Sequence, residues 1–573
     1  MEGIAGAFAT ADPTYLNVYI GIMRYLVPAL VLILLLRCGR PLLTFRREPE
    51  IWAWLCLGDD RKIPITHWEN VIGRAKSSDI CIDFPTVSRI HAVLTRYDDG
   101  SWSLADADSK DGTRVNGAPI TICELHPEDR IELGGIPMKL QPISPKQERR
   151  LAQLRTKGAG PIGSLCNVLL LTVLQVFLCV GYLLGDGGAN ATSNMIGFGG
   201  ILAAQWLLLL LYLLIKRTAF EVETLAFFLC TMGMAAICAV KPGEALKQLI
   251  AMYGGLALFL AVGWSLRKHA RAQKFRYVAA VAGVAFLVIT LLFGKEYYGA
   301  KNWLVIGSVS IQPSELTKVC FVYAGTAAMS RLINKRNLLR FIAYSIVICG
   351  CLALMNDFGT ALIFFCAFLI IAFLRSGSVG TIALACTSLG FAGVLALKIA
   401  PHAMRRFTAW RHVWEFPLTS GYQQTRSLMC ISAGGLLGLG AGQGWMRNLF
   451  AADSDVVFAT VSEEWGLLTA LMMVACILIL GLFVLRSAAV SRSSLYTIGA
   501  CAAAGILLTQ CILNALGTVD VVPLTGVTFP FVSNGGSSMI AAWGLLAFIK
   551  AADTRQNASF AVPLNPKRRD ADE

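Results

Sequence analysis

The chain has 573 residues, of which 55% are hydrophobic and only 15% charged, whereas soluble domains carry about 25% charged residues. This composition excludes a single soluble enzyme, a disordered chain and a coiled coil. The net charge of +14 could indicate a nucleic-acid ligand. However, no motif that reads DNA or RNA occurs, and in membrane proteins Lys and Arg collect on cytoplasmic loops. We therefore expect a membrane protein with no nucleic acid among its partners.

The first apolar run covers residues 15–37 and predicts an N-terminal transmembrane anchor. It is too long for the core of a signal peptide, and no small-residue cleavage site follows it. Glu2 and Asp12 precede the run, whereas Arg37, Arg40, Arg46 and Arg47 follow it. The positive-inside rule therefore predicts that the N-terminus lies outside and that the next segment lies in the cytoplasm.

Residues 50–143 are more polar and contain short alternating stretches such as 80–83 and 102–106. The turn signals Asp-Asp-Gly at 98–100 and Asn-Gly at 116–117 separate such stretches. This pattern predicts a soluble all-β domain in the cytoplasm. A basic linker follows at 144–162.

The rest of the chain is dominated by apolar runs, most of which can cross a membrane core that needs about 20 residues. Together with the first run they predict a multi-pass α-helical membrane protein of about 13 helices with an inserted all-β domain. Loops rich in Lys and Arg fall on the cytoplasmic side of this arrangement, as does a tail at 551–573. The predicted runs are 163–184, 196–215, 221–240, 246–265, 277–293, 314–330, 341–355, 359–374, 379–399, 464–485, 495–516 and 534–549.

One predicted outer loop, at about 400–462, departs from the charge rule. It is rich in glycine between 434 and 444, and it carries five arginines at 405, 406, 411, 426 and 447. A long outer loop can translocate despite its charge, so these arginines could be an indifferent surface. Alternatively, they could neutralise an anionic ligand at the outer leaflet, such as a pyrophosphate-linked lipid.

Three motifs occur in order within the β region: Gly73-Arg74, then Ser88-Arg89-Ile90-His91, then Gly112-Thr113-Arg114-Val115-Asn116-Gly117. This pattern closely resembles the forkhead-associated (FHA) domain over essentially all of residues 50–143. The resemblance implies a β-sandwich that binds phosphothreonine peptides through its loops, which is a known class of peptide recognition. It also implies a partner that is a phosphothreonine-containing protein or a Ser/Thr kinase.

A phosphate dianion requires charge-assisted hydrogen-bond donors, which arginine and hydroxyl side chains provide. An asparagine in the last motif would bind the backbone of the ligand, and His91 is expected to brace a loop rather than touch phosphate. Any one of these side chains could simply be solvated. The predicted phosphopeptide-binding residues are Arg74, Ser88, Arg89, Thr113 and Asn116.

Four further segments are similar to the FtsW/RodA/SpoVE (SEDS) glycosyltransferases over roughly residues 221–550. The resemblance implies a SEDS-type membrane domain of ten helices, to which the anchor, the FHA domain and an extra helix pair at 163–216 are additions. The segments are Trp303 with 311–318 (IQPSELTK), then 356–360 (NDFGT), then 421–466 with its motifs GYQ, GGLLGLG, DVVFA and EEWG, and then 523–538 (PLTGVTFPFVSNGGSS).

This resemblance implies a peptidoglycan glycosyltransferase that polymerises lipid II at the outer face of the bacterial cytoplasmic membrane, for cell division or elongation. It places the catalytic acid of the family at Asp455, within Ser454-Asp455-Val456-Val457-Phe458-Ala459. It also implies a class B penicillin-binding protein, a transpeptidase, as the membrane partner. No transpeptidase motif occurs in this chain, so crosslinking is expected to come from elsewhere.

The chemistry suits a single carboxylate, because an α-linked donor that becomes a β-linkage requires inversion by direct displacement. A base must then accept the acceptor proton, although Asp455 taken alone could be a solvated loop residue. The departing pyrophosphate needs cations; the candidates are Arg405, Arg406 and Lys318, together with a divalent cation such as Mg²⁺ or Mn²⁺. Gln312, Glu315, Gln423 and Ser537 complete the predicted substrate-binding set; Glu315 and Lys318, three residues apart, could instead simply pair.

Four positions depart from the motifs of the family: Asn302, Phe450-Ala451, Val456 and Asn534. They leave open the details of substrate contact and the choice between division and elongation. Two alternative functions also remain at this point: a transporter that flips lipid II, and a non-catalytic scaffold of the wall-synthesis complex. An Asp455→Asn variant tested for both polymerisation and translocation separates them.

Overall fold

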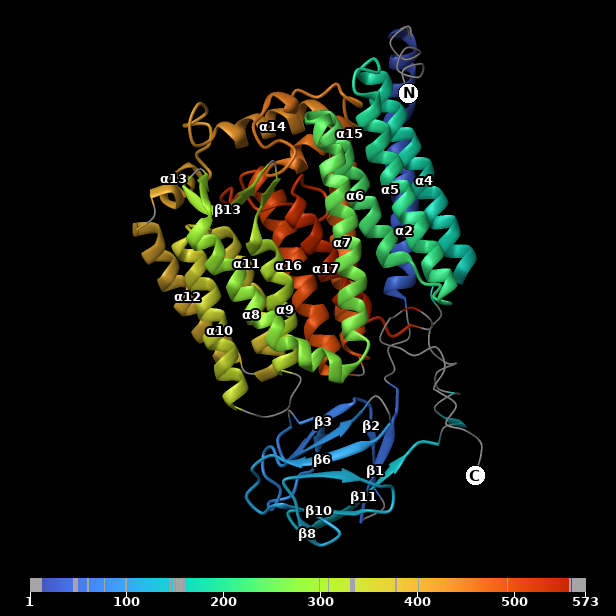
Figure 1. Ribbon diagram of the computed structural model, residues 1–573, viewed down its shortest axis with the longest axis vertical. Coiled ribbons are helices and arrows are strands. Elements are labelled where there is room, and N and C mark those ends of the chain that lie inside the picture. Colours follow the sequence, from blue (N-terminus) through green and yellow to red (C-terminus); the bar gives the residue numbers. More distant parts are fainter. Residues whose placement is uncertain are drawn as a thin grey trace.

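The computed structural model describes residues 13–44, 50–58, 61–76, 78–97, 100–144, 146–147, 150, 158, 160–297, 299–307, 309–329, 335–376, 379–399, 401–491, 493–555 and 558. Its helices form a large bundle, and a set of β-strands lies beyond one end of that bundle (Figure 1). Glu2, Asp12, Arg46, Arg47, the two aspartates of the predicted turn at 98–100, most of the linker and the tail beyond 558 lie outside the described residues.

Each of the thirteen predicted apolar runs coincides with a helix, because a helix satisfies its own backbone hydrogen bonds in an apolar environment. In the described part of the chain, nine helices are long and apolar enough to cross a membrane, and Phe358–Leu374 and Gly536–Ala551 are shorter apolar helices. The thirteen are α2 (Pro13–Leu43), α4 (Gly160–Gly185), α5 (Ala191–Leu214), α6 (Glu221–Val240), α7 (Ala245–Leu266), α8 (His269–Phe293), α9 (Pro313–Met329), α10 (Lys335–Leu354), α11 (Phe358–Ser376), α12 (Val379–Ile399), α15 (Val457–Ala488), α16 (Ser494–Thr518) and α17 (Gly536–Ala551).

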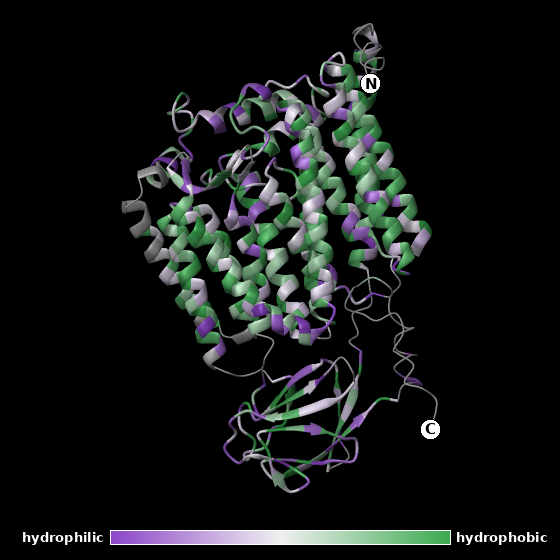
Figure 2. Cartoon of the chain, viewed as in Figure 1, coloured by the Kyte–Doolittle hydropathy of each residue, from purple (hydrophilic) through white to green (hydrophobic). Residues whose placement is uncertain are grey.

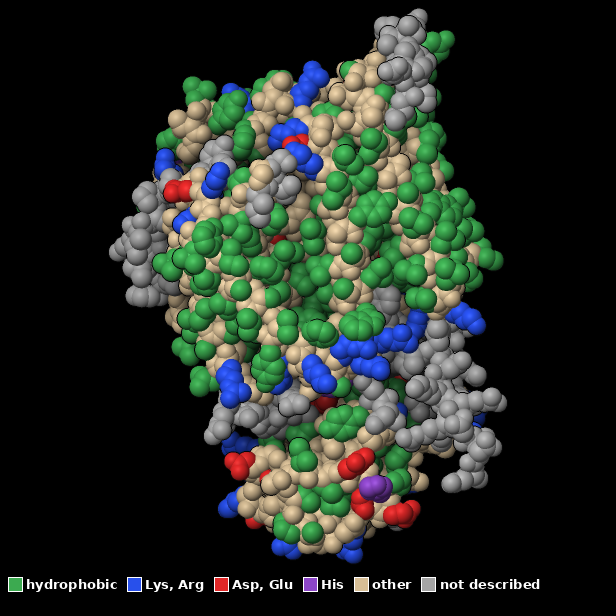
Figure 3. Space-filling view, viewed as in Figure 1, with side chains coloured by type: hydrophobic (Ala, Val, Ile, Leu, Met, Phe, Trp, Pro, Cys, Tyr) green, Lys and Arg blue, Asp and Glu red, His purple; other side chains and the backbone are tan. Residues whose placement is uncertain are grey.

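Burial divides the bundle into inner and outer helices. Helix α6 is almost wholly buried and packs against α2, α4, α5 and α15. Helix α17 is buried along its length between α7, α9 and α16. Hydrophobic side chains cover the middle of the bundle, and Lys and Arg gather at the end nearest the β-strands (Figures 2 and 3). This distribution is that of a multi-pass membrane protein.

The β-strands form a sandwich of two sheets. The order in the first sheet is β2-β1-β11-β10-β7-β8 and in the second β4-β3-β5-β6-β9. Buried residues alternate with less buried ones in strands such as Ala53–Leu57, and Trp52 packs edge-on against Trp68 with ring centroids 6.0 Å apart. The strands are β1 (Ala53–Leu57), β2 (Lys62–Ile65), β3 (Glu69–Gly73), β4 (Ile80–Cys81), β5 (Ala92–Arg96), β6 (Trp102–Asp106), β7 (Thr113–Val115), β8 (Ala118–Pro119), β9 (Ile122–Leu125), β10 (Arg130–Leu133) and β11 (Ile136–Pro142).

The sandwich contacts the bundle at the start of α16. The carboxylate of Glu69, at the beginning of β3, accepts hydrogen bonds from the Ser493 hydroxyl at 2.7 Å and from the Ser494 backbone N–H at 2.9 Å. An acidic group is favourable there because the first N–H groups of a helix lack partners within the helix and carry partial positive charge.

Buried ion pairs join α6 to the chain that follows α17, at the same end of the bundle as the sandwich. Arg555 pairs with Asp553 at 2.7 Å and with Glu221 at 3.2 Å, and all three side chains are buried. Lys550 pairs with Glu223 at 3.1 Å. The bundle therefore extends at least to Arg555, whereas the sequence predicted a tail from residue 551.

Shorter elements cover the other end of the bundle, opposite the sandwich (Figure 1). Two of them, α14 and η2, pack against α15, and the helical ones lie in the outer loop that the sequence singled out for its arginines. These elements are β12 (Lys295–Tyr297), β13 (Ala300–Ile306) and β14 (Val309–Ile311), which form one sheet, together with α13 (Pro401–Ala409), α14 (Tyr422–Gly434) and the 3₁₀ turn η2 (Met446–Asn448).

Candidate functional sites

Asp455 lies two residues before α15, at the end of the bundle that faces away from the sandwich. Its backbone N–H donates to the Ala451 carbonyl at 3.0 Å, and its own carbonyl accepts from the Asn514 side chain at 2.9 Å. Asn514 also donates to the Val527 carbonyl at 2.8 Å. A buried amide on α16 thus joins the Asp455 turn to the 523–538 segment.

The Asp455 carboxylate faces an exposed glycine of that segment. A methyl group added at Gly526 would lie 3.3 Å from Asp455 Oδ2 and 3.9 Å from Arg406 Nη1. Gly526 therefore marks a place where the carboxylate and the guanidinium group of Arg406, from α13, approach the same point on an open surface. An acid and a cation side by side are what proton abstraction next to a departing anion requires.

The surroundings of Asp455 shift the pKa of its carboxyl group. Burial raises the pKa of this carboxyl above its ordinary value. The hydrogen bond from Ser454 and the positive charges of Arg406 and Lys241 act in the opposite direction, while the neighbouring Asp453 carboxylate adds to the rise. The result is a carboxyl group whose pKa is raised toward the range useful to a general base.

Asp453 lies next to this site and is buried. Lys241 Nζ donates to both oxygens of its carboxylate, at 3.0 and 3.2 Å, and the Asn534 side chain donates to Oδ2 at 2.7 Å. The Asn534 backbone N–H also donates to the Asp453 carbonyl at 2.7 Å. Asn534, one of the departures from the family motif, is therefore tied to the turn that carries Asp455.

The first, second and fourth motifs meet at a separate hydrogen-bonded cluster. The Gln312 side chain donates to Asp357 at 3.2 Å, and the Gln312 backbone N–H donates to the Ser537 hydroxyl at 3.1 Å. Asn302 donates to the same Asp357 oxygen at 3.1 Å. The structure thus brings together two of the predicted substrate-binding residues, Gln312 and Ser537.

The other predicted substrate-binding residues have different surroundings. Lys318 pairs with Glu315 at 2.6 Å, and the two side chains are only 1% and 6% exposed, so the pairing expected from their spacing is present. The Gln423 side chain donates to the Phe450 carbonyl at 3.1 Å. Arg405 and Arg406 are exposed on α13.

The glycine-rich stretch makes close contact with α15. Methyl groups added at Gly434 and Gly438 would lie within 2.4 Å of the carbonyl oxygens of Ser462 and Glu464, so no larger residue fits. The buried Glu463 carboxylate accepts the backbone N–H groups of Trp445 and Met446, both at 2.9 Å. These glycines therefore serve close backbone packing.

A divalent cation would need a set of ligand side chains. Across the residues that the structure describes, no three His, Cys, Asp or Glu side chains gather closely enough to hold one. The divalent cation considered from the sequence therefore has no preformed set of three such protein ligands within the described part of the chain.

The sandwich presents its three motifs on neighbouring loops. Arg74 and Arg89 are exposed, and the Arg74 backbone N–H donates to the Ser88 carbonyl at 2.9 Å. His91 is fully buried; its Nδ1 accepts from the Ser88 N–H at 3.1 Å and its Nε2 lies 3.1 Å from the Gly112 carbonyl. His91 therefore joins two loops, in the bracing position that the sequence analysis expected.

Thr113 and Asn116 also have partners within the sandwich. The Thr113 hydroxyl is buried and donates to Asp106 at 2.6 Å, and Asn116 donates to Asp129 at 2.8 Å. Burial alone would raise the pKa of Asp106, but the hydrogen bonds from Ser109 and Thr113 lower it overall. In this structure Thr113 holds a loop together and does not project toward solvent.

Comparison with known proteins gives the class of this membrane protein. Residues 242–558, more than half of the chain, match the FtsW/RodA/SpoVE family model described as cell cycle protein, and residues 70–134 match the FHA domain. The chain therefore belongs to the FtsW/RodA/SpoVE family and carries an FHA domain. The family match begins after α6, so the first four helices of the bundle lie outside it.

Two curated relatives illustrate the similarity. The chain is 29% identical to the peptidoglycan glycosyltransferase RodA of Mycobacterium tuberculosis over 324 residues, which covers 53% of this chain and 69% of that protein. It is 30% identical to the probable peptidoglycan glycosyltransferase FtsW of Bacillus subtilis over 352 residues, covering 56% and 85%.

Solved structures are similar at lower identity. A chain from a peptidoglycan synthase complex is 23% identical, covers 58% of this chain and 96% of its own length, and has a TM-score of 0.48. RodA of Thermus thermophilus is 22% identical, with coverages of 58% and 94% and a TM-score of 0.42. An FHA domain studied for phosphothreonine-dependent interactions is 30% identical, with coverages of 16% and 98% and a TM-score of 0.16.

Proposed function

We propose that this protein is a peptidoglycan glycosyltransferase that polymerises lipid II, with Asp455 as its general base. The observation that carries the proposal is the convergence of Asp455 Oδ2 and Arg406 Nη1 at the exposed Gly526. The enzyme class follows from the family and from relatives named as peptidoglycan glycosyltransferases.

In the proposed reaction, the 4-hydroxyl of the acceptor sugar attacks the anomeric carbon of the donor chain. Asp455 takes the hydroxyl proton as the new bond forms, and the bond to undecaprenyl pyrophosphate breaks on the opposite face, so the linkage inverts. The leaving group carries its negative charge away, and Arg406, with Arg405 one residue earlier, stabilises that charge. Gln312, Gln423 and Ser537 remain candidates for contacts with the sugars. Glu315 and Lys318 form a buried pair with each other.

We also propose an orientation for the bundle. Arg267 and Lys268 form the turn between α7 and α8, and Arg271 lies in the first turn of α8. The positive-inside rule assigns such basic turns to the cytoplasm. Under this rule the N-terminus lies outside, and the FHA domain and C-terminus lie inside. Asp455, at the opposite end from the sandwich, then meets lipid II at the outer leaflet.

The FHA domain would dock a phosphothreonine-containing protein, either a Ser/Thr kinase or its target, and so localise or regulate wall synthesis. Arg74, Ser88, Arg89 and Asn116 are the proposed contacts, while Thr113 would support them from below. A class B penicillin-binding protein is the proposed transpeptidase partner. The domain boundaries proposed are 50–143 for the FHA domain and 221–550 for the glycosyltransferase domain.

The decisive experiment incubates the purified full chain, with its transpeptidase partner, with labelled lipid II and resolves the products by size. Glycan strands are expected. Translocation of lipid II in proteoliposomes without strand formation would instead identify a flippase. If the protein showed neither activity, the scaffold function would remain.

Replacing Arg406 with Gln is expected to shift the pH dependence of polymerisation. A base works only when ionised, so activity falls as pH drops through its pKa. Removing the Arg406 charge, which lowers the pKa of Asp455, should move the acid limb of the kcat/KM profile to higher pH. Arg447→Gln, at another exposed arginine of the same outer segment, is the control and should leave the limb in place; equal shifts in both would contradict the assignment.

An Arg74→Ala variant should weaken binding of phosphothreonine peptides about 10- to 100-fold, because a charge-assisted hydrogen bond to the phosphate is lost. Calorimetry with the full chain in detergent measures this. Lys139→Ala removes an exposed cation of β11 that pairs with Glu128 in the connection between β9 and β10, and it should leave the affinity unchanged. An unaltered affinity in Arg74→Ala would reject the phosphate role of this arginine.

A further inference from the structure

The outer part of α15 is a separate short segment. Gly466 has φ 85° and ψ 154°, which interrupts the helix after Trp465. The segment from Val457 to Trp465 is about 12 Å long at 1.5 Å per residue. Asp455 precedes one end of this segment, and Glu463 and Glu464 lie at the other end. A tilt of the segment at the glycine end therefore displaces the carboxylate at the opposite end.

The glycine-rich stretch holds the kinked end of the segment. The backbone N–H groups of Leu439 and Gly440 donate to the carbonyls of Glu463 and Glu464, both at 2.9 Å. The Glu464 carboxylate accepts the Gly442 N–H at 3.2 Å. The glycine-rich loop thus holds the kinked end of the segment. The loop can restrain this end only if neighbouring elements hold the loop itself in place.

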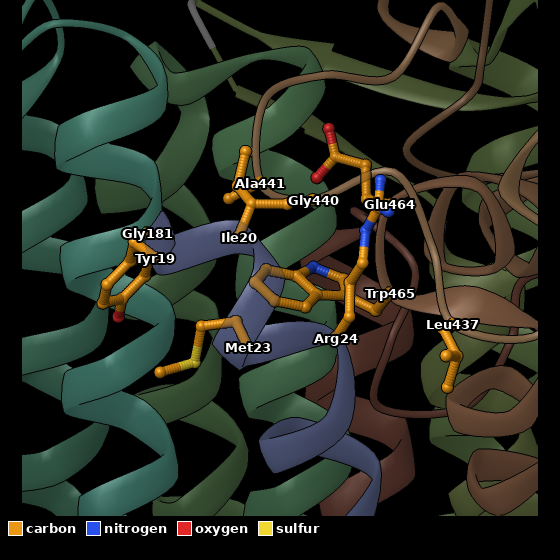
Figure 4. Close-up of a pocket in the computed structure, with 10 residues that line it drawn as sticks. All are labelled: Tyr19, Ile20, Met23, Arg24, Gly181, Leu437, Gly440, Ala441, Glu464 and Trp465. Atoms are coloured by element: carbon orange, nitrogen blue, oxygen red, sulfur yellow. The ribbon is translucent and has the colours of Figure 1, made fainter. Parts of the chain in front are cut away.

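That support comes from α2 and α4. The buried Tyr182 hydroxyl of α4 donates to Glu464 Oε2 at 2.6 Å and accepts from the Trp465 indole at 3.1 Å. Arg24 of α2 donates to the Leu439 carbonyl at 3.2 Å. Figure 4 shows Arg24 reaching from α2 toward Glu464 and Trp465, beside Gly440 and Ala441 of the loop.

The packing around these hydrogen bonds is close. A methyl group at Gly440 would lie 2.8 Å from Ile20 of α2, and one at Gly185 of α4 would lie 2.5 Å from the Ala441 carbonyl oxygen. Gly440 therefore lets the loop backbone approach the Ile20 side chain of α2, and Gly185 permits backbone contact between α4 and the loop. Neither helix belongs to the matched family region, which begins at residue 242.

We propose that Tyr182 and Arg24 are positioning residues of the glycosyltransferase, which hold the kinked end of the 457–465 segment and thereby place Asp455. This inference rests on the proposed function. It assigns to α2 and α4 a part in the outer active site in addition to membrane anchoring. The chain runs from α2 into the FHA domain. The same helix therefore connects that domain to the loop that holds the 457–465 segment.

The test compares two buried tyrosines with the same chemistry. Tyr182→Phe removes the hydroxyl that donates to Glu464, and Tyr212→Phe removes one that donates to Glu223 at 2.7 Å, at the other end of the bundle. Tyr182→Phe should lower kcat for lipid II polymerisation about tenfold with less than about a twofold change in KM. Tyr212→Phe should keep kcat within about twofold of the wild-type value, while it lowers the thermal midpoint of unfolding by about as much as Tyr182→Phe does.

A second measurement does not depend on catalysis. Hydrogen exchange of the amides at 437–446 should rise in Tyr182→Phe and in Arg24→Gln, less in Arg24→Lys, and not in Tyr212→Phe. If the wild type formed no glycan, the proposed function would fail while the exchange data still tested the support of the loop. Unchanged kcat and unchanged exchange in Tyr182→Phe, or equal kcat losses in both tyrosine variants, would overturn the inference.

Discussion

Asp455→Asn is expected to reduce polymerisation of lipid II by about 10²- to 10⁴-fold, the range that a general base contributes. Asparagine keeps the size of the side chain but cannot accept the acceptor proton. The backbone hydrogen bonds of residue 455, from Asn514 and to Ala451, do not involve its side chain, so the turn should persist. Strand formation from labelled lipid II, followed by gel electrophoresis, measures the effect.

The matched control for this variant is Asp186→Asn, at a carboxylate in the turn between α4 and α5, at the same end of the bundle. It should retain activity within about twofold. If Asp455→Asn polymerised at the wild-type rate, the carboxylate would not be the base. A parallel assay of lipid II translocation would detect the alternative function in which the same residue serves transport.

Gly526→Ala is expected to lower polymerisation by about 10- to 100-fold, since small displacements at a reacting centre are costly. Two effects combine at this position. The added methyl would lie 3.3 Å from Asp455 Oδ2, and the backbone has φ +70°, which L-residues with a side chain disfavour. The methyl also occupies the exposed point at which the carboxylate and Arg406 converge.

Gly187→Ala separates these two effects. Gly187 has φ +59°, but a methyl added there meets nothing within 4 Å. The control therefore introduces similar backbone strain without filling the site, and it should lower the thermal midpoint while leaving kcat near that of the wild type. Equal losses of kcat in the two variants would attribute the effect of Gly526→Ala to strain alone.

The helices could be predicted from the sequence because lipid imposes one strong rule, that a spanning backbone must satisfy its own hydrogen bonds. The run predicted at 221–240 coincides with α6 at both ends. The start of the predicted tail at residue 551 differs from the structure, because the polar Arg555 is buried in ion pairs with Glu221 and Asp553. Polarity alone does not reveal such a partner more than 300 residues away.

The site was only partly predictable. Its family motif singles out Asp455, whereas no motif singles out Asn514, Gly526 or Asp453 individually. Asn514 and Gln510 are the two amide side chains of the largely apolar α16, and an intramembrane polar residue is a functional candidate by default, so a signal for Asn514 is present in the sequence. The pairing of Asp453 with Lys241 joins residues 212 positions apart, and no local pattern encodes it.

The contact between Glu69 and the start of α16 has a consequence for genetic experiments. Excising the whole FHA domain removes the proposed phosphopeptide receptor. It also removes the Glu69 carboxylate that accepts the Ser494 N–H at the start of α16, the helix that bears Asn514 near its far end. Growth defects of such a truncation would therefore combine two effects: the loss of phosphopeptide docking and the loss of the contact that Glu69 makes with the membrane domain. Point substitutions at Arg74 or Arg89 leave Glu69 in place, so they are the cleaner alleles for testing the proposed phosphopeptide docking.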